Sequence, residues 1–196
     1  MRFEKFSDRL QQSLSDAQSL ATGKDHTAIS TLHILATLLE ESSNQSLLQQ
    51  AGVKLTELKD KLNQALQDAP TIANPTGDVN LNPEAAKVLN LADSYAQKAG
   101  DEFLTTDWVL LALAEQGETH KLFTATGGDG KKLRSVIEKI RGNEKVPTSN
   151  HEENRDALGK YTIDLTDRAL AGKLDPVIGR DDEIRRTMQV LQRRTK

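Results

Sequence analysis

An internal repeat constrains the fold of this chain more than any other feature of its 196 residues. A shift of 75 residues aligns 7–65 with 82–140 without a gap. Two copies in one register predict two equivalent structural units with a shared pattern of buried positions. The matched pairs include Leu14 and Leu89, Ala17 and Ala92, Ser19 and Ser94, Ala21 and Ala96, Thr31 and Thr106, Leu35 and Leu110, Leu38 and Leu113, Gly52 and Gly127, and Leu58 and Leu133.

The apolar residues of each copy follow a helical period. In the first helix of each copy they stand at i, i+4, i+7 and i+11, on one face. Asn82 followed by Pro83 is typical of a helix start, and the repeat gives Ser7 the same capping position. Strand patterns are rare, so we expect an all-α fold, a pseudo-twofold double repeat of about eight helices. Further boundary signals are Ser30 and Thr105 before the second helices, Gly52 and Gly127 before the last helices, and Asp129 as the cap of 131–141.

Breaker residues and polar stretches divide the chain into three parts. Residues 1–142 hold both repeats, at 7–66 and 82–141, joined by a proline-containing connector. Residues 143–155 are polar and without periodicity, which predicts a flexible linker with little to bury. In the third part, 156–196, we expect a short helix over 161–171, an extended or turn-like stretch over 175–180 and a helix over 181–196.

The composition excludes several classes of protein. The absence of cysteine excludes disulfide scaffolds and thiol chemistry, and it fits a cytoplasmic location. A net charge of −3 gives no general bias toward nucleic acid, and the arginines near the C-terminus are interpreted as a solvated face or a subunit contact. No apolar run approaches the ~18 residues that a membrane span needs.

The sequence contains no recognisable catalytic or metal-binding motif. The four histidines lack ligand spacing, and neither a G-x-S-x-G nucleophile motif nor a phosphate-binding loop is present. The glycine-rich stretch 127–132 comes nearest to such a loop, but its place in the repeat favours a plain helix–helix turn. We therefore expect no catalytic residue, no metal ion and no bound cofactor in this chain.

Two departures from the repeat suggest a binding surface. Leu91 stands where the first copy has Asp16, and Trp108 stands where it has His33. Leu91 is ~100° around the helix from the apolar face, and Tyr95 follows one turn later. We interpret Leu91, Tyr95 and Trp108 as a shallow groove for hydrophobic segments of unfolded proteins. The alternative is that these residues pack against a neighbouring helix or the linker.

Three polar residues complete the candidate substrate site. Asp101 and Asp107 stand near the start of the second helix of copy two and could rim the groove, although a role in the loop and toward the helix dipole is favoured. Ser7 is likewise first a helix cap.

The last forty residues resemble a known family closely. Lys-Tyr-Thr-Ile-Asp-Leu-Thr at 160–166, Gly-Lys-Leu-Asp-Pro-Val-Ile-Gly-Arg at 172–180, and Gln-Val-Leu-Gln-Arg-Arg-Thr-Lys at 189–196 resemble the start of the first ATPase module of ClpB-type AAA+ disaggregases. The double helical repeat is similar to the Clp amino-terminal domain. We therefore expect this chain to be the opening part of a longer protein, ending before the phosphate-binding loop.

The resemblance implies a function for that longer protein. It implies a homohexameric ATPase that uses ATP and Mg²⁺, threads polypeptides out of aggregates and works with the DnaK chaperone system in stressed cells. It also implies that Val177, Ile178 and Gly179 contribute to an adenine pocket, which is incomplete in this chain. Ring assembly in such proteins comes from the ATPase modules, so we expect this chain alone to be a monomer.

Two functions compete for the repeat domain. The first is a module that binds unfolded or aggregated polypeptides for the motor. The second is an adaptor-docking domain of a Clp ATPase that feeds a protease. An enzyme would need a phosphate-binding loop, so we expect this chain to hydrolyse no ATP.

Overall fold

The computed structural model describes residues 3–71, 79–142, 145–153, 165–170, 172 and 179–192. The chain divides into two compact units, Met1–Ala157 and Leu158–Lys196, and each is described by itself. After a short 3₁₀ helix, Phe3–Lys5, the helices of the first unit are α1 Asp8–Gly23, α2 Thr31–Leu38, α3 Ser42–Gln50, α4 Leu55–Gln67, α5 Pro83–Ala99, α6 Thr106–Glu115, α7 Gly117–Ala125 and α8 Gly130–Arg141.

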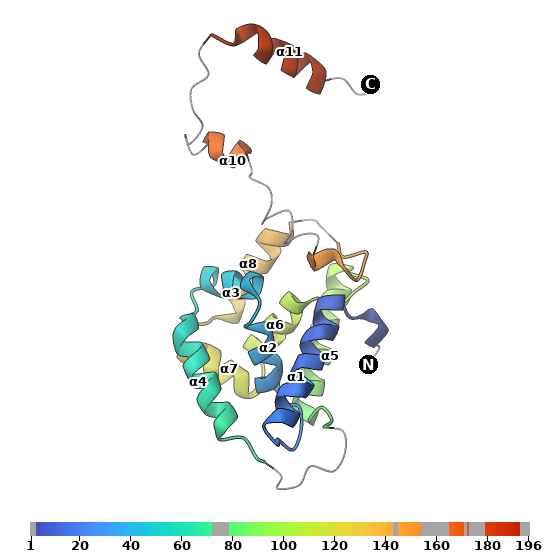
Figure 1. Cartoon of the computed structure of the whole chain (residues 1–196), viewed down its shortest axis with the longest axis vertical. Coiled ribbons are helices and arrows are strands. Elements are labelled where there is room, and N and C mark those ends of the chain that lie inside the picture. Colours follow the sequence, from blue (N-terminus) through green and yellow to red (C-terminus); the bar gives the residue numbers. More distant parts are fainter. Residues whose placement is uncertain are drawn as a thin grey trace. The chain divides into compact units, whose positions relative to one another are not determined.

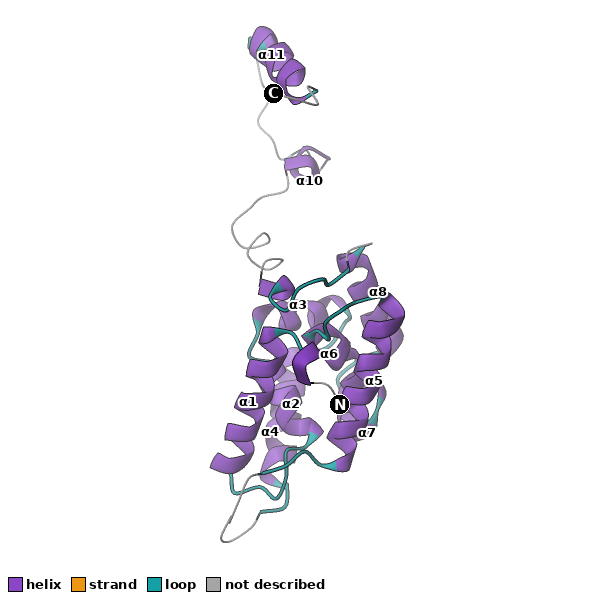
Figure 2. Ribbon diagram, turned by 90° about the vertical axis from the view of Figure 1, so that its right-hand side faces the viewer, coloured by secondary structure: helices purple, strands orange, loops and turns teal. Residues whose placement is uncertain are grey.

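The helix boundaries confirm the repeat. Each helix of the first copy has a partner in the second that begins 75 residues later, from the pair α1 and α5 to the pair α4 and α8. Figure 1 shows α2 and α6 in the middle of the unit, with α1 and α5 on one side and α4 and α7 on the other. Figure 2 shows the same arrangement from the side. The predicted all-α double repeat is therefore correct for the first unit.

The predicted caps form at three helix starts. The Ser7 hydroxyl accepts a hydrogen bond from the Leu10 amide, and the Asn82 side chain accepts one from the Ala85 amide. Asp129 accepts a hydrogen bond from the Lys131 amide, as expected for the start of α8. Such side chains satisfy amides that the first helical turn leaves without partners.

The two middle helices carry the centre of one common core. Every residue of α6 from Thr106 to Ala114 is buried, and α2 is buried at Thr31–Leu35 and Leu38. Because both copies contribute to one core, neither copy is a separate domain. The largest fully buried side chains include Leu10, Ile34, Leu35, Leu38, Leu48, Leu58, Leu89, Leu104, Leu110, Leu111 and Phe123.

The linker predicted over 143–155 is packed in the part that the structure describes. Residues 145–153, here called the strap, belong to the first unit, with Val146 and Glu152 buried. The strap is the orange segment beside the blue N-terminal end in Figure 1. Of residues 145–153 only one valine and one glutamate are buried, and no periodic pattern reveals their contacts.

The second unit contains two described helices, α10 Leu165–Leu170 and α11 Asp181–Leu191. Ile184, Met188 and Leu191 are exposed on α11. Of the expected adenine-pocket residues, Val177 and Ile178 lie outside the described residues, and Gly179 is an exposed residue with a left-handed backbone, at φ +72°. The parts of the expected helices at 161–164, 171 and 193–196 also lie outside the described residues.

Candidate functional site: an aromatic pocket beside a buried ion-pair cluster

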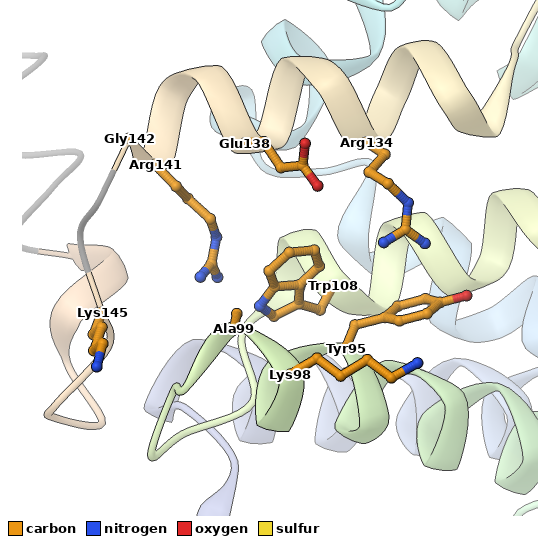
Figure 3. A pocket seen from close by; sticks show the side chains of 9 residues that line it. All are labelled: Tyr95, Lys98, Ala99, Trp108, Arg134, Glu138, Arg141, Gly142 and Lys145. Atoms are coloured by element: carbon orange, nitrogen blue, oxygen red, sulfur yellow. The ribbon is translucent and has the colours of Figure 1, made fainter.

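A pocket of about 540 Å³ lies between α5, α6, α8 and the strap. Figure 3 shows Arg134 and Arg141 projecting from α8 toward the rings of Tyr95 and Trp108, while Lys145 stands on the strap. We call this site the aromatic pocket. Its floor is aromatic and its walls carry four cationic side chains, Lys98, Arg134, Arg141 and Lys145, and one carboxylate, Glu138.

Each aromatic ring of the pocket is covered by an arginine. The Tyr95 and Trp108 ring centroids are 6.2 Å apart, and each ring lies 4.5 Å from a guanidinium carbon, that of Arg134 and Arg141 respectively. This is the geometry of a cation–π contact. The Tyr95 hydroxyl donates to Glu115, and burial together with this carboxylate raises the pKa of Tyr95 to about 12. Tyr95 is therefore a neutral, fixed ring at neutral pH.

A buried ion-pair cluster holds the Trp108 side of the pocket. The Arg141 guanidinium donates to both Asp107 oxygens, at 2.7 and 2.8 Å, to Asp101 at 2.6 Å, and to the Thr105 hydroxyl. The Trp108 indole N–H donates to the same Asp101 oxygen, at 2.8 Å. Burial alone disfavours the Arg141 cation, but Asp107 and Asp101 outweigh this effect and raise the pKa of Arg141.

This cluster changes the interpretation of the predicted groove. Trp108 is 4% exposed, and Asp107 is also buried, so neither presents an open surface. Asp101 and Asp107 hold an arginine inside the unit, rather than forming the groove rim that was the less favoured of their two interpretations. Leu91 is partly buried against the core and does not line the aromatic pocket. The structure thus brings Tyr95, Trp108 and the two aspartates together and leaves Leu91 to one side.

Ser7 lies outside the aromatic pocket. Besides capping α1, its hydroxyl donates to the buried Glu152 carboxylate at 2.5 Å, and its amide donates to the Leu104 carbonyl at 2.9 Å. The other Glu152 oxygen accepts from the amide and hydroxyl of Thr106, at 2.9 and 2.6 Å. Ser7 therefore joins the start of α1 to the strap and to the start of α6.

The first copy has a polar cluster at the equivalent place. The His26 Nδ1 and His33 Nε2 atoms are 2.6 Å apart, and His33 Nδ1 accepts a hydrogen bond from the Ser30 amide. His33 is therefore neutral, with its proton on Nε2 and directed at His26. Burial and the neighbouring His26 lower the pKa of His33 to about 4, and burial also lowers the pKa of His26.

The two clusters are related by the repeat. His26, His33 and Leu66 in the first copy correspond to Asp101, Trp108 and Arg141 in the second. Both copies thus bury a polar contact between the loop before the second helix and that helix itself. The first copy uses two histidine rings, whereas the second uses the Asp101 carboxylate and the Trp108 indole, with Arg141 of α8 added as the cation.

We expect the free energy of unfolding of the first unit to fall as the pH drops from about 6.5 toward 4. In this range His33 takes up a proton in the unfolded chain but stays neutral in the folded one, because burial lowers its pKa to about 4. Urea unfolding at pH 7, 5.5 and 4.5 measures the effect. His33→Gln removes this titration, so the decrease should be smaller in that variant, and an equal decrease in both proteins would contradict the assignment.

Sequence reasoning missed Arg134, Arg141, Lys145 and Glu152. A signal existed for Arg141, because an arginine stands where the first copy has the buried Leu66. No pattern in the sequence marks Glu152 or Lys145.

The described residues form neither a metal-binding group nor a membrane-spanning helix. No three histidine or acidic side chains in the described ranges come together as a metal-binding group. Of the helices that the structure describes, none is both long enough and apolar enough to cross a lipid bilayer.

Comparison with known proteins places this arrangement in a family. The family model described as the Clp repeat (R) N-terminal domain matches residues 5–125. The chaperone protein ClpB of Pseudomonas putida is 50% identical over 199 residues, an alignment that covers 100% of this chain and 23% of that protein. The ClpB of Dichelobacter nodosus is 46% identical, covering 98% of this chain and 23% of that protein. The chain thus spans less than a quarter of the length of these relatives.

Solved structures share the fold at low sequence identity. The Hsp104 N-terminal domain of Candida albicans has a TM-score of 0.69 and 21% identity, over 74% of this chain and 97% of that one. A ClpV N-domain, solved in complex with a VipB peptide, has a TM-score of 0.56 and 19% identity, over 72% of this chain and 89% of that one. The family match covers both helical repeats up to α7, so the chain belongs to the Clp repeat N-terminal domain family.

Proposed function

We propose that the aromatic pocket binds extended segments of unfolded or aggregated polypeptide for a ClpB-type disaggregase. The observation that carries the proposal is the half-buried Tyr95 ring, which lines a pocket of about 540 Å³ and is backed by the buried Trp108 ring. Aromatic rings contribute a large apolar contact area and do not require a particular partner sequence. The exposed lysines Lys98 and Lys145 at its edge would favour segments that also carry acidic side chains.

The other predicted site residues take separate roles in this proposal. Leu91 lies one turn before Tyr95 on α5, and it would extend the apolar side of the pocket along the helix. Asp101 and Asp107 would hold Trp108 and Arg141 in place, and Ser7 would hold the strap. A ClpV N-domain solved with a VipB peptide supports peptide binding by this fold.

We propose a wider context from the resemblance and from the ClpB relatives. A protein carrying this domain would be a cytoplasmic homohexamer that hydrolyses ATP with Mg²⁺ and works with the DnaK system. Val177, Ile178 and Gly179 would belong to its adenine pocket, and the present chain alone would be monomeric and without ATPase activity.

Tyr95→Ala is expected to weaken the binding of reduced, unfolded casein by about fivefold to tenfold, or ~1 kcal/mol. The substitution removes one of the two rings, while the Trp108 ring and its Arg141 contact remain. Fluorescence anisotropy of labelled casein, titrated with the 196-residue chain, measures the dissociation constant.

Leu20→Ala is the matched control for this experiment. The repeat places Leu20 at the position of Tyr95, and both side chains are partly buried against the core, but Leu20 lies far from the pocket in sequence and does not line it. Unchanged casein binding by Tyr95→Ala, or equal weakening by both variants, would move the site away from the pocket. Binding of casein no tighter than of a folded protein would favour the adaptor-docking alternative.

A further inference from the structure

The strap contacts the helical part of the first unit at three places. The Glu102 amide donates to the Val146 carbonyl at 3.0 Å, and the Val146 amide donates to Asp101 Oδ1 at 3.1 Å. Further along, the Asp8 amide donates to the Ser149 carbonyl at 3.0 Å. The third attachment is the buried Glu152 carboxylate. The strap thus crosses from the aromatic pocket to the starts of α1 and α6.

Glu152 accepts three hydrogen bonds, more than any other residue of the strap. It accepts hydrogen bonds from the Ser7 hydroxyl and from the amide and hydroxyl of Thr106. The Thr106 amide belongs to the first turn of α6, where a carboxylate is favoured by the helix dipole. Burial and the nearby Asp107 carboxylate raise the pKa of Glu152, so the same contact also carries an electrostatic cost.

The apolar anchoring of the strap is small by comparison. Val146 is its one buried apolar side chain among residues 145–153. Ordering nine residues costs conformational entropy. The burial of one valine and a few hydrogen bonds stabilise the docked strap by only slightly more than this cost. A segment with such a balance opens locally while the helical core stays folded.

One carboxylate links the strap to the pocket. Asp101 accepts from the Val146 amide through Oδ1 and from both Trp108 and Arg141 through Oδ2. Lys145, the first residue of the strap, lines the aromatic pocket itself. Release of the strap therefore removes one wall of the pocket and one of the three hydrogen bonds that fix Asp101.

We propose that the strap is a reversible latch, fastened by Glu152, whose docked state completes the aromatic pocket and whose released state frees residues 145–153 from the helical core. Nine released residues reach up to about 30 Å when extended. Because the docked strap forms part of the pocket, an occupant of the pocket stabilises docking, and docking strengthens binding of the occupant by the same factor. The latch itself follows from contacts within the chain, and only this coupling rests on the proposed function.

Glu152→Gln in the 196-residue chain tests the latch. The amide group of glutamine has one acceptor oxygen, so it cannot accept the Ser7 and Thr106 hydrogen bonds as the carboxylate does. Hydrogen exchange at the Glu102 and Val146 amides is expected to quicken about tenfold or more, while the Leu35 amide in α2 exchanges as before. Glu153→Gln, which changes the exposed neighbour, is the matched control and should alter none of these rates.

A disulfide that holds the strap in its docked position should have the opposite effect to Glu152→Gln. The Asp8 and Ser149 side chains lie 3.0 Å apart, and the native chain has no cysteine, so Asp8→Cys with Ser149→Cys offers one disulfide across the strap. When oxidised it should slow trypsin cleavage after Lys145 at least tenfold relative to its reduced form. Unchanged exchange in Glu152→Gln, acceleration that extends to Leu35, or equal cleavage of both redox forms would each overturn the latch.

The coupling is tested with reduced casein. Saturating casein should slow exchange at the Glu102 and Val146 amides of the native chain severalfold, and Glu152→Gln should bind casein more weakly than Glu153→Gln. Casein binding that depends on Tyr95 but leaves these amides unchanged would overturn the coupling. Absence of any casein binding would reject the proposed function and the coupling with it, while the exchange and cleavage results would still decide the latch.

Discussion

Arg141→Met is expected to lower the free energy of unfolding of the first unit by about 3–5 kcal/mol, the cost of breaking a buried ion pair from one side. Methionine retains much of the side-chain volume, but Asp101 and Asp107 then remain buried without their cation. The Trp108 ring also loses its guanidinium contact. Urea unfolding followed by circular dichroism measures the change, and the thermal midpoint should fall by about 10 °C.

Lys139→Met is the matched control, since Lys139 is an exposed cation on the same helix. It should change the free energy of unfolding by less than about 0.5 kcal/mol. A loss below about 1 kcal/mol for Arg141→Met would mean that the two aspartates find other partners or protonate at little cost, which would contradict the ion-pair cluster as described.

Leu35→Ala and Leu110→Ala should each cost about 2–5 kcal/mol, the range for truncating a fully buried leucine. The two residues are equivalent in the repeat, and each lies in one of the two middle helices, fully buried. Because both copies build one core, each variant should unfold in a single transition shifted to lower urea concentration.

Leu170→Ala serves as the control, since Leu170 is 82% exposed in the second unit. Its effect should stay within about 0.5 kcal/mol. Two separate transitions in either core variant, with one copy unfolding before the other, would contradict the single core.

The helical framework could be predicted from the sequence because the repeat doubles every signal. A cap or apolar position that is ambiguous in one copy is supported by the equivalent position in the other. Asn82 and Pro83, for example, mark a clear helix start and so identify Ser7 as the cap in the first copy. The departures from the repeat also identified a real difference at His33 and Trp108. The interpretation of that difference was incomplete, since both side chains are buried and differ in their polar partners.

The strap could not be predicted in this way. It lies outside the repeat, and its principal contact joins Ser7 to Glu152 across 145 positions of sequence. Periodicity reports burial only where several residues share a face, whereas the strap buries a single valine and a single glutamate. Arg141 left a signal in the repeat, where it replaces Leu66, but its role could not be predicted because its hydrogen bonds to Asp101 and Asp107 link the end of α8 to the start of α6, which no local pattern connects.

The strap also determines how the unit would respond to mechanical load. Asp8, near the first residues of the chain, and Ser149, near the last residues of the unit, are bonded through both backbone and side chains. The two ends of the helical unit therefore meet at one point. A pulling force applied through the residues after the strap would act first on the contacts of Glu152. The contacts of Ser149 and then those of Val146 would break next, before the helices unfold. The strap would therefore detach at a lower force than the helical repeats unfold, so the core would stay folded while the strap is released.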